Sequence, residues 1–126
     1  MIVGPSGRSY DPLPIDNTAG FPQVFPLLLG GVNYRFQLYV NAPEADFPPA
    51  DAVLTLPQAQ RFLVVRVDAT AADGDPQTVF LRKVTPSLEY PVGAMWLHFP
   101  TQTVAVGNLN GVGRLGSNVV GGVALS

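Results

Sequence analysis

The sequence motif with the clearest chemical precedent is the hexapeptide from Gly111 to Gly116, which has the spacing G-x-G-x-x-G. That spacing can cradle a pyrophosphate when it follows a strand, opens a helix and precedes an acidic residue by about 20 positions. Only ten residues follow Gly116, none of them is acidic, and Gly121-Gly122 would interrupt a helix. We therefore interpret the hexapeptide as a glycine loop, with Asn110-Gly111 as its turn.

The acidic residues form no recognisable ligand set or catalytic pair. Asp73-Gly74-Asp75 resembles the start of a calcium loop, but the position that requires glutamate in such a loop is occupied by Val84. A hairpin turn is the simpler interpretation, although Asp68 could join a looser site if the hairpin folds back. Glu44 and Asp46 lie in a proline-flanked stretch that is typical of a solvated loop tip, so paired-carboxylate hydrolysis is not expected.

The sequence offers few residues for nucleophilic catalysis. His98 is the single histidine, there is no cysteine, and Ser87 and Ser117 lie outside any G-x-S-x-G elbow. A lone imidazole needs a nucleophile and an orienting acid, and the sequence around His98 has no carboxylate after Glu89. We predict a packed or surface histidine and a protein that is not an enzyme, with no metal and no cofactor.

The elements that would position these residues are all predicted to be strands. Apolar and polar residues alternate from Val32 to Val40, which indicates a half-buried strand. Gly30-Gly31 predicts a tight turn that pairs this strand with the run from Phe25 to Leu29. Asp73-Gly74 and Pro76 predict a second hairpin. We expect six short strands at residues 25–29, 32–40, 61–68, 78–84, 94–99 and 103–106, with Pro100 ending the fifth.

This pattern predicts a single all-β domain over residues 1–126, a small antiparallel β-sandwich or a partly open β-barrel with long loops. Residues 1–22 would be a Pro-rich extended arm that lies over its own domain or over a neighbour, with a free disordered tail as the alternative. The β core would occupy residues 23–106 and include a long loop at 41–60. Residues 107–126 would be a Gly-rich C-terminal segment.

The composition excludes several classes of protein. Charged residues make up 13% of the chain, half of the usual quarter, and the net charge is −2. A hydrophobic content of 47% argues against disorder, and weak acidity without clustered Lys or Arg argues against nucleic-acid and anionic-membrane partners. No signal-peptide pattern or run of about 20 apolar residues is present, so a soluble, non-secreted protein is expected.

The charges are also unevenly placed. In the 35 residues from Val92 to Ser126, only Arg114 is formally charged. Either this segment is the core of the domain, or part of it is a surface that a partner covers, since interface centres are depleted in charge. We expect both, with strands in the core and a glycine-rich strip against a partner. The candidate partner interface consists of Trp96, Asn108, Leu109, Asn110, Val112, Arg114, Leu115, Val119 and Val120; Arg114 would bind a carboxylate or carbonyls there, or else lie at a solvent-facing loop tip.

Two short patterns resemble a known family. The run from Gln23 to Leu38, interrupted by Leu29-Gly30-Gly31, resembles the opening hairpin of the small baseplate plug proteins of contractile-tailed bacteriophages, of the cyanophage type. The run from Phe62 to Val67, followed by Asp73-Gly74, resembles that family's next strand and acidic-glycine turn. The similarity covers residues 23–84.

The resemblance implies a structural virion protein of the tail baseplate, synthesised in the host cytoplasm, that packs against the central trimeric hub and helps to close the tube lumen. Its partners would be the hub, the spike and neighbouring baseplate subunits, and a homo-oligomer such as a trimer is expected. The family brings no catalytic, cofactor or metal residue. The arm, the loop at 41–60 and the Gly-rich end depart from its pattern, which leaves the place in the tail open.

Two alternatives to the plug remain. One is a capsid decoration or fibre-attachment protein that uses the arm to clasp its neighbours. The other is a carbohydrate- or peptide-binding β-module, for which Tyr34, Tyr39, Tyr90 and Trp96 are the available aromatic residues.

Overall fold

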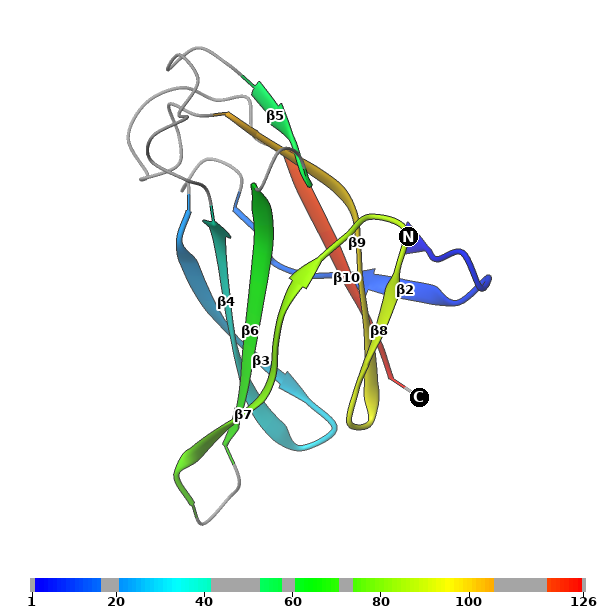
Figure 1. The fold of residues 1–126 in the computed structure, drawn as a ribbon. Helices are drawn as coiled ribbons and strands as arrows, with labels where there is room; N and C mark the ends of the chain where they lie inside the picture. The colour runs from blue at the N-terminus through cyan, green and yellow to red at the C-terminus, as the bar shows by residue number, and fades with distance from the viewer. Residues whose placement is uncertain are drawn as a thin grey trace.

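Two antiparallel sheets, packed face to face, make up the described part of a computed structural model (Figure 1). The structure describes residues 2–16, 21–41, 53–57, 61–70, 74–105 and 118–125. The all-β prediction is confirmed, and the two layers make the fold a small β-sandwich. The strands are β1 (Ile2–Val3), β2 (Ser9–Pro12), β3 (Gln23–Leu29), β4 (Val32–Asn41), β5 (Val53–Thr55), β6 (Phe62–Thr70), β7 (Pro76–Val84), β8 (Glu89–Val92), β9 (Met95–Ala105) and β10 (Asn118–Leu125).

The four-stranded sheet has the order β3-β4-β6-β7 and contains both predicted hairpins. Gly30 and Gly31 connect β3 to β4 with φ angles of 56° and 80°, which residues with a Cβ seldom adopt. Phe25 lies opposite Phe36 in this hairpin, and their rings stack with centroids 5.3 Å apart. The pairing of β6 with β7 shifts register after Val67, where Val79 is the extra residue.

The six-stranded sheet has the order β1-β2-β10-β9-β5, and β8 also pairs with β9. The prediction that Pro100 ends a strand is wrong, because β9 runs through it from Met95 to Ala105. The register explains why: Val120 pairs with Thr101 and Gly122 with His98, so residues 99 and 100 together face Gly121. Pro100 lies in this bulge, where the ladder does not require its missing N–H.

The C-terminal residues are part of the domain's own sheet. Residues 118–125 form β10, which pairs with β2 on one side and with β9 on the other, so this part of the Gly-rich segment is not a free strip for a partner. Its two adjacent glycines are required by close packing. A Cβ on Gly121 would lie 2.6 Å from the Phe99 ring, and one on Gly122 would lie 2.6 Å from the Cβ of Tyr10.

Within the predicted N-terminal arm, the described residues contribute two strands to the six-stranded sheet. Its strand β2 pairs with β10, and β1 pairs with β2. Tyr10 and Leu13 are buried, and Ile15 packs against the core. The loop predicted at 41–60 includes strand β5, which pairs with the end of β9; residues 42–52 and 58–60 lie outside the described part.

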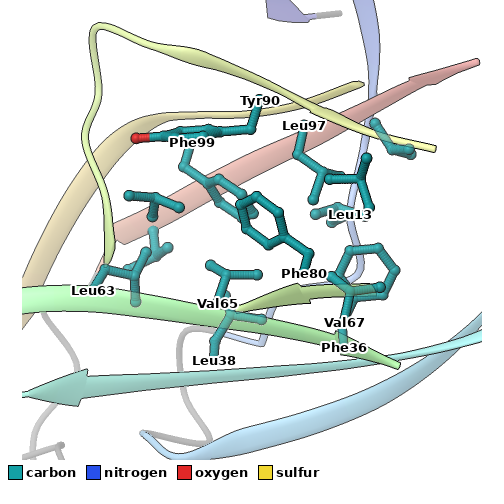
Figure 2. Packing of buried hydrophobic residues seen from close by; sticks show 14 of the residues in the cluster. Leu13, Phe36, Leu38, Leu63, Val65, Val67, Phe80, Tyr90, Leu97 and Phe99 are labelled. Atoms are coloured by element: carbon teal, nitrogen blue, oxygen red, sulfur yellow. The ribbon is translucent and has the colours of Figure 1, made fainter. Parts of the chain in front are cut away.

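Side chains from both sheets fill the space between the two layers (Figure 2). Phe36, Leu38, Val65 and Val67 point inward from the four-stranded sheet, while Leu97 and Phe99 point inward from β9. Much of the charge-poor C-terminal stretch is therefore core. The buried apolar residues among its described positions are Val92, Met95, Leu97, Phe99, Val104, Val119, Val123 and Ala124.

Candidate functional site

The structure divides the interface residues predicted from the sequence into three groups. Val119 is 1% exposed and belongs to the core, so it is not available on the surface. Trp96 and Val120 are partly buried in β9 and β10. Asn108, Leu109, Asn110, Val112, Arg114 and Leu115 lie outside the described residues, as do the G-x-G-x-x-G hexapeptide and the Glu44–Asp46 pair.

His98 is a packed side chain. It is 2% exposed, its Nδ1 lies 2.9 Å from the carbonyl oxygen of Leu88, and its ring lies 5.6 Å from that of Tyr10. Burial of this kind leaves a substrate no access to the imidazole. The described residues contain no group of three or more His, Cys, Asp or Glu side chains that could hold a metal ion. No helix in the described part of the chain is long and apolar enough to cross a membrane.

A cluster of polar side chains, here called the N-terminal latch, consists of Ser6, Arg8, Tyr10 and Glu89. The Glu89 carboxylate accepts hydrogen bonds from the Tyr10 hydroxyl (2.7 Å), the Ser6 hydroxyl (2.9 Å) and the Ser6 N–H (3.0 Å). Arg8 lies 3.5 Å from the same carboxylate, and its guanidinium covers the Trp96 ring at 4.1 Å. The latch thus connects the arm to β8 and β9.

The latch shifts the proton affinities of its members. The hydrogen bond from Tyr10, assisted by those from Ser6 and the charge of Arg8, holds the pKa of Glu89 below its usual value against the opposing effect of burial. Burial, together with the hydrogen bond to Glu89, raises the pKa of Tyr10 to about 12. Because the polar groups of these four residues bond to one another, we assign the latch a structural role.

The surface best suited to a partner lies on the opposite sheet. We define the outer face as the side of β3, β4, β6 and β7 that points away from the core; its central side chains are Val24, Pro26, Leu28, Asn33, Arg35, Gln37, Tyr39, Val64, Arg66, Asp68, Thr78, Leu81 and Lys83. Strand alternation turns these residues away from Phe36, Val65 and their inward-facing neighbours. Nothing in the described part of the chain packs over this side as the second sheet packs over the other.

A hydrogen-bonded network occupies the middle of the outer face. Asp68 accepts from the Thr78 hydroxyl at 2.7 Å and from the Nε of Arg66 at 3.1 Å, and Arg66 also donates to the Thr78 hydroxyl at 3.2 Å. The hydrogen bond from Thr78, with contributions from Arg66 and the charge of Arg35, lowers the pKa of Asp68 although burial opposes the shift. Asp68 is therefore ionised and engaged, and it holds Arg66 in place.

Two open depressions flank this network. One, of about 470 Å³, is lined by Pro22, Gln37, Tyr39, Val40, Arg66 and Leu81. The other, of about 380 Å³, is lined by Val24, Pro26, Asn33, Tyr34, Arg35 and Thr70. Each combines one arginine and one amide side chain with apolar walls. This arrangement can bind a chain that carries both charged and apolar groups, but it places no nucleophile or general base beside an enclosed cavity.

The sequence contains one indication of this surface, namely apolar residues at outward positions of two strands. Alternation within a single strand does not reveal it. Alternation from Val32 to Val40 predicts only a half-buried strand with its polar side toward solvent. Val24 and Leu28 in β3 and Leu81 in β7 are apolar residues at outward positions of the same sheet, and they are 47%, 65% and 53% exposed. Their common location depends on the sheet order β3-β4-β6-β7, in which β3 and β7 are the edge strands on either side of β4 and β6.

Comparison with known proteins adds no family to this description. The chain matches no protein-family model, no curated protein and no solved structure.

Proposed function

We propose that this protein is a structural subunit that functions by packing into a larger assembly through its outer face. The supporting observation is the exposure of Val24, Leu28 and Leu81 around the two depressions on one sheet. Val24 and Leu28 lie on the edge strand β3 and Leu81 lies on the opposite edge strand β7, so these side chains border the polar centre of the face on both sides. A surface that mixes apolar and polar side chains in this way is typical of protein–protein contacts that are not obligate. The continuous core behind this sheet would make the face a rigid platform.

We further propose that the assembly is a bacteriophage tail baseplate, in which the chain acts as a plug or adaptor against the central hub. The resemblance to small baseplate plug proteins is carried chiefly by residues 23–38, which lie in the β3–β4 hairpin. This hairpin supplies most of the outer face. Residues 23–38 therefore contribute about half of the central side chains of the surface that a neighbour would cover.

Immunoelectron microscopy of purified virus particles encoded by the same genome tests this function. An antibody raised against the full chain should label the tail tip. Label on the head would instead support the capsid decoration or fibre-attachment alternative, and absence of the chain from purified particles would overturn a virion role.

A matched pair of variants tests the surface. Particles that carry the double substitution Leu28→Glu and Leu81→Glu should lose the chain, because both charges would be placed in the contact. Particles that carry Leu88→Glu should retain it, since Leu88 is comparably exposed (52%) but lies between β7 and β8, away from the outer face. Retention of the double variant at wild-type copy number would exclude the outer face as the contact.

A further inference from the structure

The outer face has a charge opposite in sign to that of the rest of the chain. It carries Arg35, Arg66 and Lys83 but only one acid, Asp68, which gives a net charge of +2. The whole chain has seven Lys or Arg and nine Asp or Glu, so the remaining four bases and eight acids give −4. Complementary charge governs which partners approach a surface and in what register. The outer face is therefore suited to an acidic partner.

Two guanidinium groups on this face can accept such a partner. Arg35 is exposed, and no hydrogen bond from its side chain is found among the described residues. Arg66 uses its Nε and one terminal nitrogen on Asp68 and Thr78, which leaves the other terminal nitrogen for a ligand. Its side chain is 44% exposed. The Arg35 guanidinium can face both oxygens of a carboxylate with two N–H groups, whereas Arg66 offers its remaining terminal nitrogen as a single charged donor.

The register gives the spacing between these two groups. Arg35 pairs with Asp68 and Gln37 pairs with Arg66, so the two arginines are diagonal neighbours on adjacent strands. Diagonal neighbours lie about 7–8 Å apart. In an extended peptide, side chains on one side recur about every 6.6 Å. Carboxylates at alternate positions of an extended segment would therefore match Arg35 and Arg66.

The surroundings of the arginines favour a peptide over an acidic glycan. The walls beside Arg35 and Arg66 include Val24, Pro26 and Leu81, which can contact aliphatic side chains. Asn33 and Gln37 line the same depressions and can bond to a peptide main chain. Each depression is lined by one tyrosine, and Phe62, a further aromatic residue that strand alternation turns outward, contacts Lys83 and lines neither depression. Neither depression therefore offers the two aromatic rings expected for sugar stacking.

We propose that the outer face binds an extended acidic segment of a partner protein, with carboxylates at alternate positions seated on Arg35 and Arg66. This inference rests on the proposed assembly function and names the chemistry of the neighbour. Asp68, directly opposite Arg35, does not prevent binding because Arg35, Arg66 and Lys83 together outnumber it and leave the face with a net charge of +2. Aliphatic residues between the acids of the segment pack against the walls.

The test uses the full chain and a synthetic peptide of alternating Glu and Val, with an alternating Lys and Val peptide as the sign control. Titration calorimetry should show binding of the acidic peptide alone, weakened by added salt. Arg35→Gln should weaken it about tenfold, as expected for loss of a charged hydrogen bond. Leu88→Glu also changes the net charge by one negative unit, but away from the face, and should change affinity less than about twofold.

Three results would overturn the proposal. They are equal binding of the acidic peptide by the wild type and Arg35→Gln, tighter binding of a heparin fragment than of the acidic peptide, and low-salt self-association that Arg35→Gln abolishes. The last would make a second copy of this chain the occupant. If the chain is found in virus particles but fails these tests, only the acidic partner is rejected; if it is absent from particles, the assembly function fails whatever the peptide does.

Discussion

At the scale of single residues, the Glu89 carboxylate determines how firmly the arm is held. Its folded-state pKa is lowered, so its contribution to stability is complete above the unfolded-state pKa and is lost as pH falls through the folded-state value. The pKa of Tyr10 is raised from 10.0 to about 12, so its contribution is complete below pH 10.0 and is lost as pH rises toward about 12. The latch should therefore contribute most to stability at pH values above the unfolded-state pKa of Glu89 and below 10.0.

Thermal denaturation across pH checks the contribution of Glu89. Glu89→Gln keeps an acceptor for Tyr10 but removes the charge, so the loss of stability on the acid side should become shallower. Asp75→Asn removes an exposed carboxylate elsewhere and should leave that dependence nearly unchanged. An acid-side profile of Glu89→Gln that superimposes on the wild type would show that the latch carboxylate does not stabilise the fold.

A second prediction at this scale concerns Gly121. Gly121→Ala should lower the free energy of unfolding by about 1–3 kcal/mol, because the new Cβ would lie 2.6 Å from the fully buried Phe99 ring. Gly74→Ala is the matched control: among the described residues nothing lies within 4 Å of its Cβ position. It should change stability by less than about 0.5 kcal/mol. Urea denaturation measures both, and equal effects would contradict the packing explanation.

At the scale of elements, the β3–β4 turn depends on positive φ angles and not on space. Gly30 has a φ of 56° and nothing within 4 Å of its Cβ position among the described residues. Gly30→Val should cost about 1–2 kcal/mol because a β-branched residue is strained there. Gly30→Asn should cost much less, since asparagine tolerates this conformation in hairpin turns. Chemical denaturation would contradict this account if the two variants were equally unstable.

The same element shows what sequence patterns can and cannot predict. Alternation from Val32 to Val40 and the Gly30-Gly31 pair correctly predicted a hairpin, because both signals are local. The strand through Pro100 and the strand formed by residues 118–125 were missed because their causes are nonlocal. A bulge opposite Gly121 accommodates Pro100, and the close approach of Phe99 and Tyr10 requires the adjacent glycines. Composition alone made those glycines look like a loop.

For the candidate site too, local features could be predicted from the sequence and nonlocal ones could not. Arg35 and Gln37 could be placed on one side of a strand from period two, yet their relation to Arg66 required the register of β4 with β6. The charge-poor C-terminal stretch suggested a covered surface, but several of its apolar side chains were instead needed for the core between two sheets. Counting charged and apolar residues along the chain cannot separate a domain core from a surface that a partner covers, because both bury apolar area.

At the scale of the whole molecule, one core joins the two sheets, so the described strands should unfold together. Phe36 belongs to the four-stranded sheet and is 0% exposed, whereas Trp96, the single tryptophan, lies in β9 of the other sheet. Phe36→Ala should destabilise the protein by about 3–5 kcal/mol. Because the cavity weakens a core shared by both layers, the Trp96 fluorescence transition should shift to lower denaturant together with the circular-dichroism transition.

The exposed Leu28→Ala variant in the same sheet is the control and should shift both transitions only slightly. Two separated transitions, with Trp96 fluorescence unaffected by Phe36→Ala, would mean that the sheets unfold as independent units. The four-stranded sheet that carries the outer face could then unfold while the six-stranded sheet stays folded. Coincident transitions would support the single domain predicted from the sequence and the rigid platform on which the proposed assembly contact depends.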